Sequence, residues 1–277
     1  MSVLANSISK AGIVQGQRFE FGRNWSRFLS VLNQKRIDQA IASLNTMLEG
    51  ENINGKRFLD AGSGSGLFSL AARQLGATVH SFDYDSQSVA CTRELRRRYF
   101  PDDSEWTVEE ASVLDRDYIH MLGQFDVVYS WGVLHHTGAM WQALENVAAL
   151  VAMGGRLIIA IYNDQGLASR YWLAVKRTYV RHPLMRWPLV LLHIPHPFIS
   201  SWIARAMTGR LTQERGMSLW YDLIDWIGGY PFEVASPEDI VRLYQCKGFI
   251  LLKMKTTSRH GCNEFVFMRG APTRAER

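Results

Sequence analysis

The chain has 277 residues, of which 47% are hydrophobic and 12% aromatic, and its formal net charge is +5. This composition excludes global disorder and provides enough chain for one large domain with an insertion. The three cysteines, Cys91, Cys246 and Cys262, form no CxxC pair. We therefore expect no disulfide framework and no metal site, and the cysteine usage together with the absence of a secretory-signal pattern in residues 1–17 predicts a cytoplasmic location.

Residues 19–49 carry apolar side chains at helical spacing, which predicts a helix. We expect residues 1–50 to form an N-terminal helical segment.

From residue 57 onward, apolar runs typical of strands alternate with helical patterns. The predicted strands are 57–61, 78–82, 106–109, 125–130 and 155–162, and the predicted helices are 66–75, 86–98, 115–121 and 139–152. This alternation predicts a doubly wound α/β sheet that is mostly parallel. Near the end, Ser236 precedes a helix that stops at Gly248, and strands 249–256 and 263–268 form an antiparallel pair. We expect seven strands, with 51–163 as the Rossmann-like core and 236–277 completing the sheet.

A glycine-rich loop follows the first predicted strand. Gly62, Gly64 and Gly66 follow Asp60 and open a helix, which predicts close approach of the backbone to a ligand and free amides at the helix start. Because residue 67 is leucine, the dinucleotide spacing G-x-G-x-x-G is not met. Asp83 ends the second predicted strand, where a carboxylate can accept hydrogen bonds from both hydroxyls of a ribose. A plain strand–helix turn with Asp83 as a helix cap is the alternative.

With these motifs, the sequence resembles the class I S-adenosylmethionine-dependent methyltransferases, in particular the branch with the ubiquinone-pathway O-methyltransferases. The matching segments are Leu59–Gly66, Phe82–Asp83, Ala111–Asp115, Phe125–Ser130 and Gly154–Ile159. The resemblance implies S-adenosyl-L-methionine as cofactor and assigns residues to its parts. Asp60 and the glycine loop would hold the methionine part, Asp83 the ribose and Tyr84 the adenine face. Ser112 and Val113 would frame the adenine edge, and Ser130 and Trp131 would face the methionine end and the acceptor. Residues 19–28 resemble the segment that folds over the donor pocket in related methyltransferases, so residues 1–50 would form an N-terminal helical lid. An amphipathic helix that only packs on the core is the alternative.

The loop after the fourth predicted strand is expected to border the acceptor, because ligands bind beyond the carboxyl ends of strands in such sheets. It contains His135 and His136, and a histidine there is a candidate general base for a hydroxyl acceptor. Capping or packing roles are the alternative for both. The polar and aromatic stretch 215–233 is a further candidate for the pocket wall, although a satellite core would have the same composition.

Residues 164–235 form the expected insertion, helical, basic and aromatic. Within it, residues 167–215 hold eight arginines and lysines and only Glu214 as an acid, a net charge of +7. Residues 187–204 carry no formal charge, but Pro188, Pro195 and Pro197 argue against a spanning helix. Three interpretations remain: a lid over the acceptor, a face that contacts an anionic membrane surface, or a buried hairpin with solvated arginines.

These observations predict a methyltransferase that acts on a small or lipid-linked acceptor, with a hydroxyl oxygen as the first choice. An RNA methyltransferase of the same fold and a non-catalytic S-adenosylmethionine-binding regulator are the alternatives. Nucleic acid is the less favoured partner because the basic residues are interleaved with apolar ones.

Overall fold

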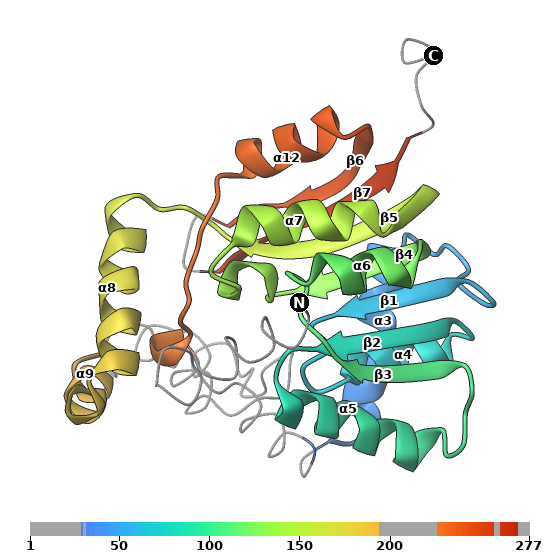
Figure 1. The fold of residues 1–277 in the computed structure, drawn as a ribbon, viewed down its shortest axis with the longest axis horizontal. Coiled ribbons are helices and arrows are strands. Elements are labelled where there is room, and N and C mark those ends of the chain that lie inside the picture. The colour runs from blue at the N-terminus through green and yellow to red at the C-terminus, as the bar shows by residue number, and fades with distance from the viewer. Residues whose placement is uncertain (1–28, 30–31, 194–225, 258–260, 271–277) are drawn as a thin grey trace, which may run out of the picture.

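The computed structural model describes residues 29, 32–193, 226–257 and 261–270 (Figure 1). Its centre is a seven-stranded sheet in the order β3-β2-β1-β4-β5-β7-β6. The five strands from β3 to β5 are parallel, and β7 pairs antiparallel with β5 and with β6. The strands are β1 (Arg57–Ala61), β2 (Thr78–Asp83), β3 (Trp106–Glu110), β4 (Phe125–Trp131), β5 (Val151–Tyr162), β6 (Phe249–Lys255) and β7 (Cys262–Arg269). The predicted seven-stranded doubly wound sheet is confirmed.

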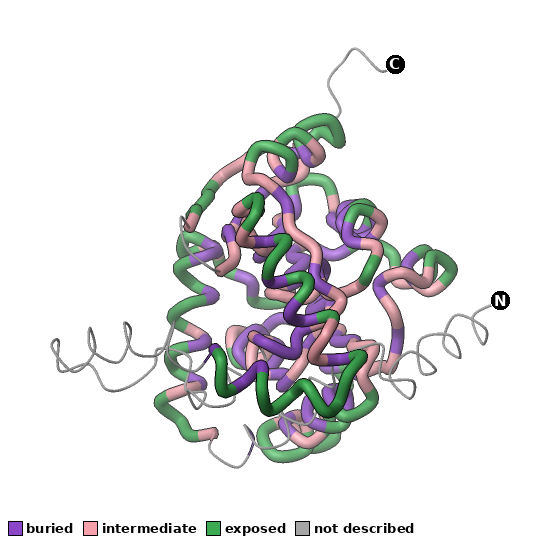
Figure 2. The backbone as a smooth tube through the Cα atoms, turned by 90° about the vertical axis from the view of Figure 1, so that its left-hand side faces the viewer, coloured by how far each residue is buried: buried purple, intermediate pink, exposed green. Residues whose placement is uncertain are grey.

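Helices cover both faces of this sheet. On one face, α3 (Gln34–Met47), α4 (Leu67–Gln74) and α5 (Ser86–Tyr99) enclose a core that includes Phe58, Trp106 and Val127. On the other, α6 (Arg116–Leu122), α7 (Met140–Ala149) and α12 (Pro237–Cys246) enclose a second core, and Figure 1 shows these three helices in front of the sheet. Successive residues of one strand point to opposite faces of the sheet and pack in different cores. The central strands are therefore mostly apolar along their length. Figure 2 shows the buried segments in the interior and the exposed helix faces around them.

The predicted helix over residues 19–49 is wrong at its middle. Helix α3 begins only at Gln34, because Asn33 has an extended backbone and its side chain accepts a hydrogen bond from the Arg36 amide. Asparagine is a strong N-cap and ends the helical pattern on its N-terminal side. Residues 1–28 of the predicted lid lie outside the described residues.

The insertion contributes α8 (Leu167–Arg181), the 3-10 turn η2 (Pro183–Met185), α9 (Arg186–His193) and a short helical stretch at 226–228. The inner sides of α8 and α9 bury Trp172, Val175, Leu189 and Val190 in a separate apolar cluster with Ile227 and Phe232. Residues 194–225, and with them most of the uncharged stretch 187–204, lie outside the described residues, as do residues 258–260 between the last two strands.

The boundaries of two further predicted helices agree with the structure to different degrees. Helix α12 has Ser236 as its N-cap, whose hydroxyl oxygen accepts from the Asp239 amide, as predicted. Helix α7, in contrast, stops at Ala149 rather than 152, and β5 already begins at Val151 with an irregular register against β4.

Candidate active site

A cavity of about 800 Å³ opens beyond the carboxyl ends of β1, β2 and β4. Nine of the residues that the sequence predicted for the site line it: Asp60, Gly62, Gly64, Asp83, Tyr84, Ser112, Val113, Trp131 and His136. The other three, Gly66, Ser130 and His135, are not among the lining residues. The strand ends therefore bring most of the predicted site together, as expected for a doubly wound sheet.

The glycine loop uses its amides internally. The Gly62 and Ser63 amides both donate to the Phe82 carbonyl, at 2.8 and 3.1 Å, and the Gly66 amide donates to the Ser63 carbonyl at 2.8 Å. The Gly64 amide donates to the Asp83 carboxylate at 2.9 Å. The expectation of free amides is thus wrong for these four positions, because the turn closes on itself and on β2.

Two glycines of this loop are required by protein neighbours. Gly62 has φ +87°, and a Cβ there would lie 2.4 Å from a methyl carbon of Val133. A Cβ on Gly66 would lie 2.9 Å from the Cα of Thr92, so Gly66 seats α4 against α5 rather than lining the cavity. Only glycine fits such positive φ values without strain.

Three carboxylates surround the donor end of the cavity: Asp60, Asp83 and Asp85. The pKa of Asp60 is raised to about 7, mainly by burial and also by the charge of Asp83, although hydrogen bonds from Ser69 oppose the rise. Burial likewise raises the pKa of Asp83 to about 6, although amide hydrogen bonds from Asp85 and Gly64 oppose the rise. The raised pKa values show that the charged form of these carboxylates is destabilised by burial. A positively charged ligand would stabilise that form, so the site favours such a ligand.

A chain of hydrogen bonds leads from the outermost strand to Asp60. The Trp106 indole donates to the Ser81 hydroxyl at 2.9 Å, Ser81 donates to the Ser69 hydroxyl at 2.8 Å, and Ser69 donates to the Asp60 carboxylate at 2.5 Å. All three donors are buried. The sequence analysis missed Ser69 and Ser81, whose only signal is a small polar residue inside an apolar segment.

The predicted adenine side is held by the β3–α6 loop. The Ser112 hydroxyl oxygen accepts from the Leu114 amide at 3.2 Å, and the Val113 carbonyl accepts from the Asn146 side chain at 2.7 Å. Both residues and Tyr84 line the cavity. The loop is therefore tied to α7 from behind.

Aromatic rings form the opposite wall. Tyr129 stacks on Phe68 with ring centroids 4.8 Å apart, and on Trp131 at 5.8 Å with nearly parallel planes. Ser130 points the other way, and its hydroxyl donates to the Ala61 carbonyl at 2.7 Å. The predicted contact of Ser130 with a ligand is replaced by a bond between β4 and β1, because neighbouring strand residues face opposite sides of the sheet.

Helix α3 supplies part of the cavity wall that the sequence analysis did not identify by residue. Arg36, Gln39, Ser43 and Met47 line the cavity along one helix face. Their spacing of three and four residues, with polar side chains inside an amphipathic pattern, was the available signal.

The two neighbouring histidines differ in environment. His135 is 0% exposed, and burial lowers the pKa of its ring well below the ordinary value, assisted by the charges of His136 and Lys176. Its Nδ1 accepts from the Tyr162 amide at 3.4 Å. His136 is half-buried and lines the cavity, and its Nδ1 is 2.6 Å from the Pro231 carbonyl oxygen. A carbonyl only accepts, so Nδ1 of His136 carries a proton and the lone pair of the neutral ring is on Nε2.

The segment before α12 closes this side of the cavity. Tyr230 and Pro231 line it, and the carboxylate of Glu233 accepts from the Met140 amide at 3.0 Å, which caps α7. The Glu233 amide donates to the His135 carbonyl at 3.0 Å. Part of the predicted pocket stretch 215–233 therefore borders the cavity, and residues 215–225 lie outside the described residues.

The arrangement suits a cationic ligand without phosphates. A diphosphate needs amide donors and positive charge, but the four loop amides above are occupied and three acids stand around them. S-adenosylmethionine carries a sulfonium and offers ribose hydroxyls as donors, which match carboxylate acceptors. In the described part of the chain, no three or more histidine, cysteine, aspartate or glutamate side chains are arranged so that they could hold a metal ion.

Comparison with known proteins agrees with this geometry. A family model described as a methyltransferase domain matches residues 32–221. A tRNA U34 carboxymethyltransferase from Methylococcus capsulatus is 30% identical over 179 residues, covering 64% of this chain and 49% of that protein. A ubiquinone biosynthesis O-methyltransferase from Caulobacter is 30% identical over 146 residues, covering 49% of this chain and 54% of that protein. The chain thus spans about half the length of the curated relatives it matches.

Solved structures show the same fold at low sequence identity. Magnesium protoporphyrin IX methyltransferase from Synechocystis, with bound S-adenosylhomocysteine, matches with a TM-score of 0.50 at 18% identity, covering 86% of this chain and 83% of that one. An O-methyltransferase family protein from Burkholderia thailandensis matches with a TM-score of 0.53 at 14% identity, covering 87% and 57%.

Proposed function

The chain belongs to the methyltransferase domain family, and on that premise we propose that it moves a methyl group to a hydroxyl oxygen of a small or lipid-linked acceptor. S-adenosyl-L-methionine is the cofactor. When bound, it supplies a methyl group on a positively charged sulfur, and transfer of that methyl group leaves S-adenosylhomocysteine. The observation that carries the hydroxyl assignment is His136, which lines the cavity with the lone pair of its neutral ring on Nε2.

The residues at the donor end would divide the cofactor between them. Asp83 would accept from the ribose hydroxyls, and Asp60 with the glycine loop would face the cationic methionine part. Tyr84, Ser112 and Val113 would enclose the adenine. Gly66, Ser130 and His135 act behind the wall, where they fix the loop and β4.

His136 would take the acceptor proton at Nε2. Its Nδ1 proton is held by the Pro231 carbonyl, so the ring has a fixed orientation and tautomer. A ring held in this way can accept a proton without first rotating, and general-base catalysis of this kind contributes about 10²–10⁴-fold in rate. His135 is unsuited to this role because it is fully buried.

The test is the variant His136→Gln, with His120→Ala at an exposed position of α6 as the matched control. We expect kcat to fall by about 10²–10⁴-fold in His136→Gln while cofactor affinity stays within a factor of two or so, because the base acts only on the acceptor. A normal rate in His136→Gln, or an equal loss in His120→Ala, would refute the base assignment.

RNA is the second candidate acceptor, and the tRNA-modifying relative favours it. Methyl-tritiated S-adenosylmethionine, added with the protein to lysate from a strain that lacks the gene, distinguishes the cases by fraction. Label in lipid or polar small molecules supports the first proposal, and label in RNA replaces it. Cofactor binding without any transfer, in fresh lysate, would support a non-catalytic regulator.

A further inference from the structure

The helices α8 and α9, with η2 between them, expose an unusual mixture of side chains. We call residues 167–193 the arm. In the described part of the chain, fourteen large apolar side chains are exposed, and eight of them lie on the arm: Leu167, Tyr171, Leu173, Leu184, Met185, Trp187, Leu191 and Leu192. Leu184, at 92% exposed, is the most exposed of all fourteen. Concentrated apolar exposure of this kind marks an interaction surface.

The charge of the arm is entirely positive. Arg170, Arg177, Arg181 and Arg186 are exposed, and the arm contains no aspartate or glutamate. The cations and the apolar residues share one continuous stretch, because all eight residues from 181 to 188 are exposed. Arg186 precedes Trp187 directly, and Arg181 lies three residues before Leu184. Positive charge and exposed apolar side chains are therefore mixed along the arm and do not lie on separate faces.

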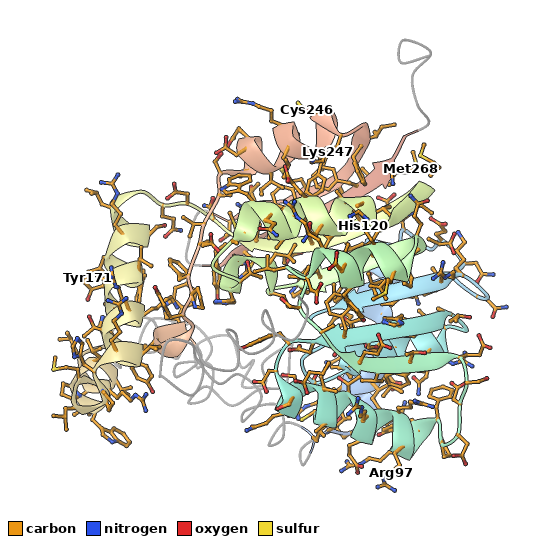
Figure 3. All side chains as sticks on the ribbon, viewed as in Figure 1. Arg97, His120, Tyr171, Cys246, Lys247 and Met268 are labelled. Atoms are coloured by element: carbon orange, nitrogen blue, oxygen red, sulfur yellow. The ribbon has the colours of Figure 1, made fainter. Side chains whose placement is uncertain are left out.

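The exposed side of the arm is distinct from the side that packs on the protein. The inner side is buried through Trp172, Val175, Leu189 and Val190. A hydrogen bond of 2.7 Å between the Tyr171 hydroxyl and Nε2 of His193 joins α8 to α9. No residue of the arm is among the described residues that line the cavity. Figures 1 and 3 show α8 and α9 standing apart from the sheet, with Tyr171 on the outer side. These contacts do not support a lid function for the described arm.

We propose that the arm docks on the surface of an anionic membrane. Leucine, methionine and tryptophan side chains would enter the region between headgroups and acyl chains, and the arginines would meet the lipid phosphates. None of the described helices has the length and apolar character needed to cross a bilayer. Nucleic acid would use the arginines but leave Leu184, Leu191 and Leu192 in water, and for that reason lipid is the better match.

The docking also has a geometric consequence. The arm begins five residues after Tyr162, the last residue of β5, on the side of the sheet where the parallel strands end and the cavity opens. An arm lying on a bilayer therefore keeps this edge of the sheet near the lipid surface.

The experiment is co-sedimentation of the full chain with vesicles of phosphatidylcholine alone or mixed with phosphatidylglycerol. We expect binding to the mixed vesicles only, and a decrease as salt is raised. Each exposed arginine should contribute about fivefold in affinity, so Arg181→Gln with Arg186→Gln should lose about 25-fold. Leu191→Ser with Leu192→Ser should lose at least about tenfold, because the apolar insertion is removed.

Matched controls lie elsewhere on the surface. Arg97→Gln on α5 removes one positive charge, as Arg186→Gln alone does (Figure 3), and Met121→Ser on α6 removes one apolar side chain that is 78% exposed. Both should bind vesicles like the wild type. Equal binding to phosphatidylcholine, or an equal loss in Arg97→Gln, would overturn the proposal. The proposal would also be overturned if sedimentation equilibrium showed a dimer that Leu191→Ser with Leu192→Ser dissociates, since a second copy of the chain would then cover the arm. The readout is vesicle binding alone, so it stands or falls separately from the proposed transfer reaction.

Discussion

The Asp83 carboxylate organises the donor loop and at the same time destabilises the ligand-free protein. Its two oxygens accept from the Gly64 and Asp85 amides, each at 2.9 Å. Its pKa nevertheless rises from 3.8 to about 6, and burial is the largest cause. Replacing Asp83 by asparagine removes the titrating group with almost no change in shape.

The expected effect on stability follows from this pKa. A carboxyl group with a raised pKa in the folded state holds its proton more tightly there, so the free energy of unfolding decreases as the pH rises through both values. A difference of about 2 pH units corresponds to about 3 kcal/mol in total. About 2 kcal/mol of that loss falls between pH 4.5 and pH 7.5. Asp83→Asn lacks this loss, so its stability relative to wild type should improve by about 2 kcal/mol over the same range.

The affinity for S-adenosylmethionine should move in the opposite direction. Loss of charge-assisted acceptors for the ribose costs at least about 1.5 kcal/mol, or about tenfold in Kd. Urea unfolding of the ligand-free protein at the two pH values and calorimetry with the cofactor at pH 7.5 measure both effects. Asp117→Asn, at an exposed position of α6, is the control for affinity. A stability difference that stays constant with pH would refute the burial argument, and unchanged calorimetry would refute the ribose assignment.

Three further outcomes follow from the same site. The pKa of Asp60 is about 7 and that of Asp83 about 6, so both carboxylates gain protons as the pH falls and lose the charge that binds the cofactor. Cofactor affinity should therefore weaken by up to about tenfold per pH unit between pH 7 and 6, and more steeply below pH 6. A calorimetric affinity that stays constant from pH 5.5 to 8 would contradict this. Ser69→Ala removes the hydrogen bond that lowers the pKa of Asp60, so the same profile should shift to higher pH, and an unshifted profile would argue against the hydrogen-bond chain. Gly62→Ala should lower the free energy of unfolding by at least about 2 kcal/mol, because its Cβ would overlap Val133 at a positive φ; wild-type urea unfolding would disprove that packing.

The fold could be predicted because its sequence signals are local and repeated. The central parallel strands β4 and β5 are covered on both faces and are therefore mostly apolar. Glycines follow β1 and β4, and β2 and β3 end on acidic residues. The one large error is the continuous helix over residues 19–49. Asn33 is an N-cap that interrupts the helix there, although the apolar spacing of the sequence continues across it.

The site could be predicted at the strand ends and less well behind them. Asp60 and Asp83 occupy positions that the strand pattern fixes, and the structure places both on the cavity. The choice between His135 and His136 could not be made, because the two lie in a 3-10 turn where consecutive side chains point about 120° apart. Which one faces the cavity depends on Tyr162 and Pro231, which are distant in sequence.

The amides of the glycine loop illustrate a different limit. Glycine spacing indicates a tight turn, but the partners of its amides are the Phe82 carbonyl and the Asp83 carboxylate at the end of β2, and the Ser63 carbonyl within the loop. Such partners depend on the packing of β1 against β2, so the sequence could not distinguish an anion-binding turn from a closed one.

The position of β7 has a consequence for biosynthesis. This strand comes after β6 in the chain yet lies between β5 and β6, with Phe265 and Phe267 in the core. Strands β1 to β5 can pair as they leave the ribosome, whereas β6 has no neighbour to join until β7 has been synthesised. Until then β5 presents an unpaired apolar edge, a site where nascent chains are prone to associate with one another. A ribosome stalled before Cys262 would therefore hold a sheet that lacks two strands rather than one, and such a chain should be a target for chaperones or proteases.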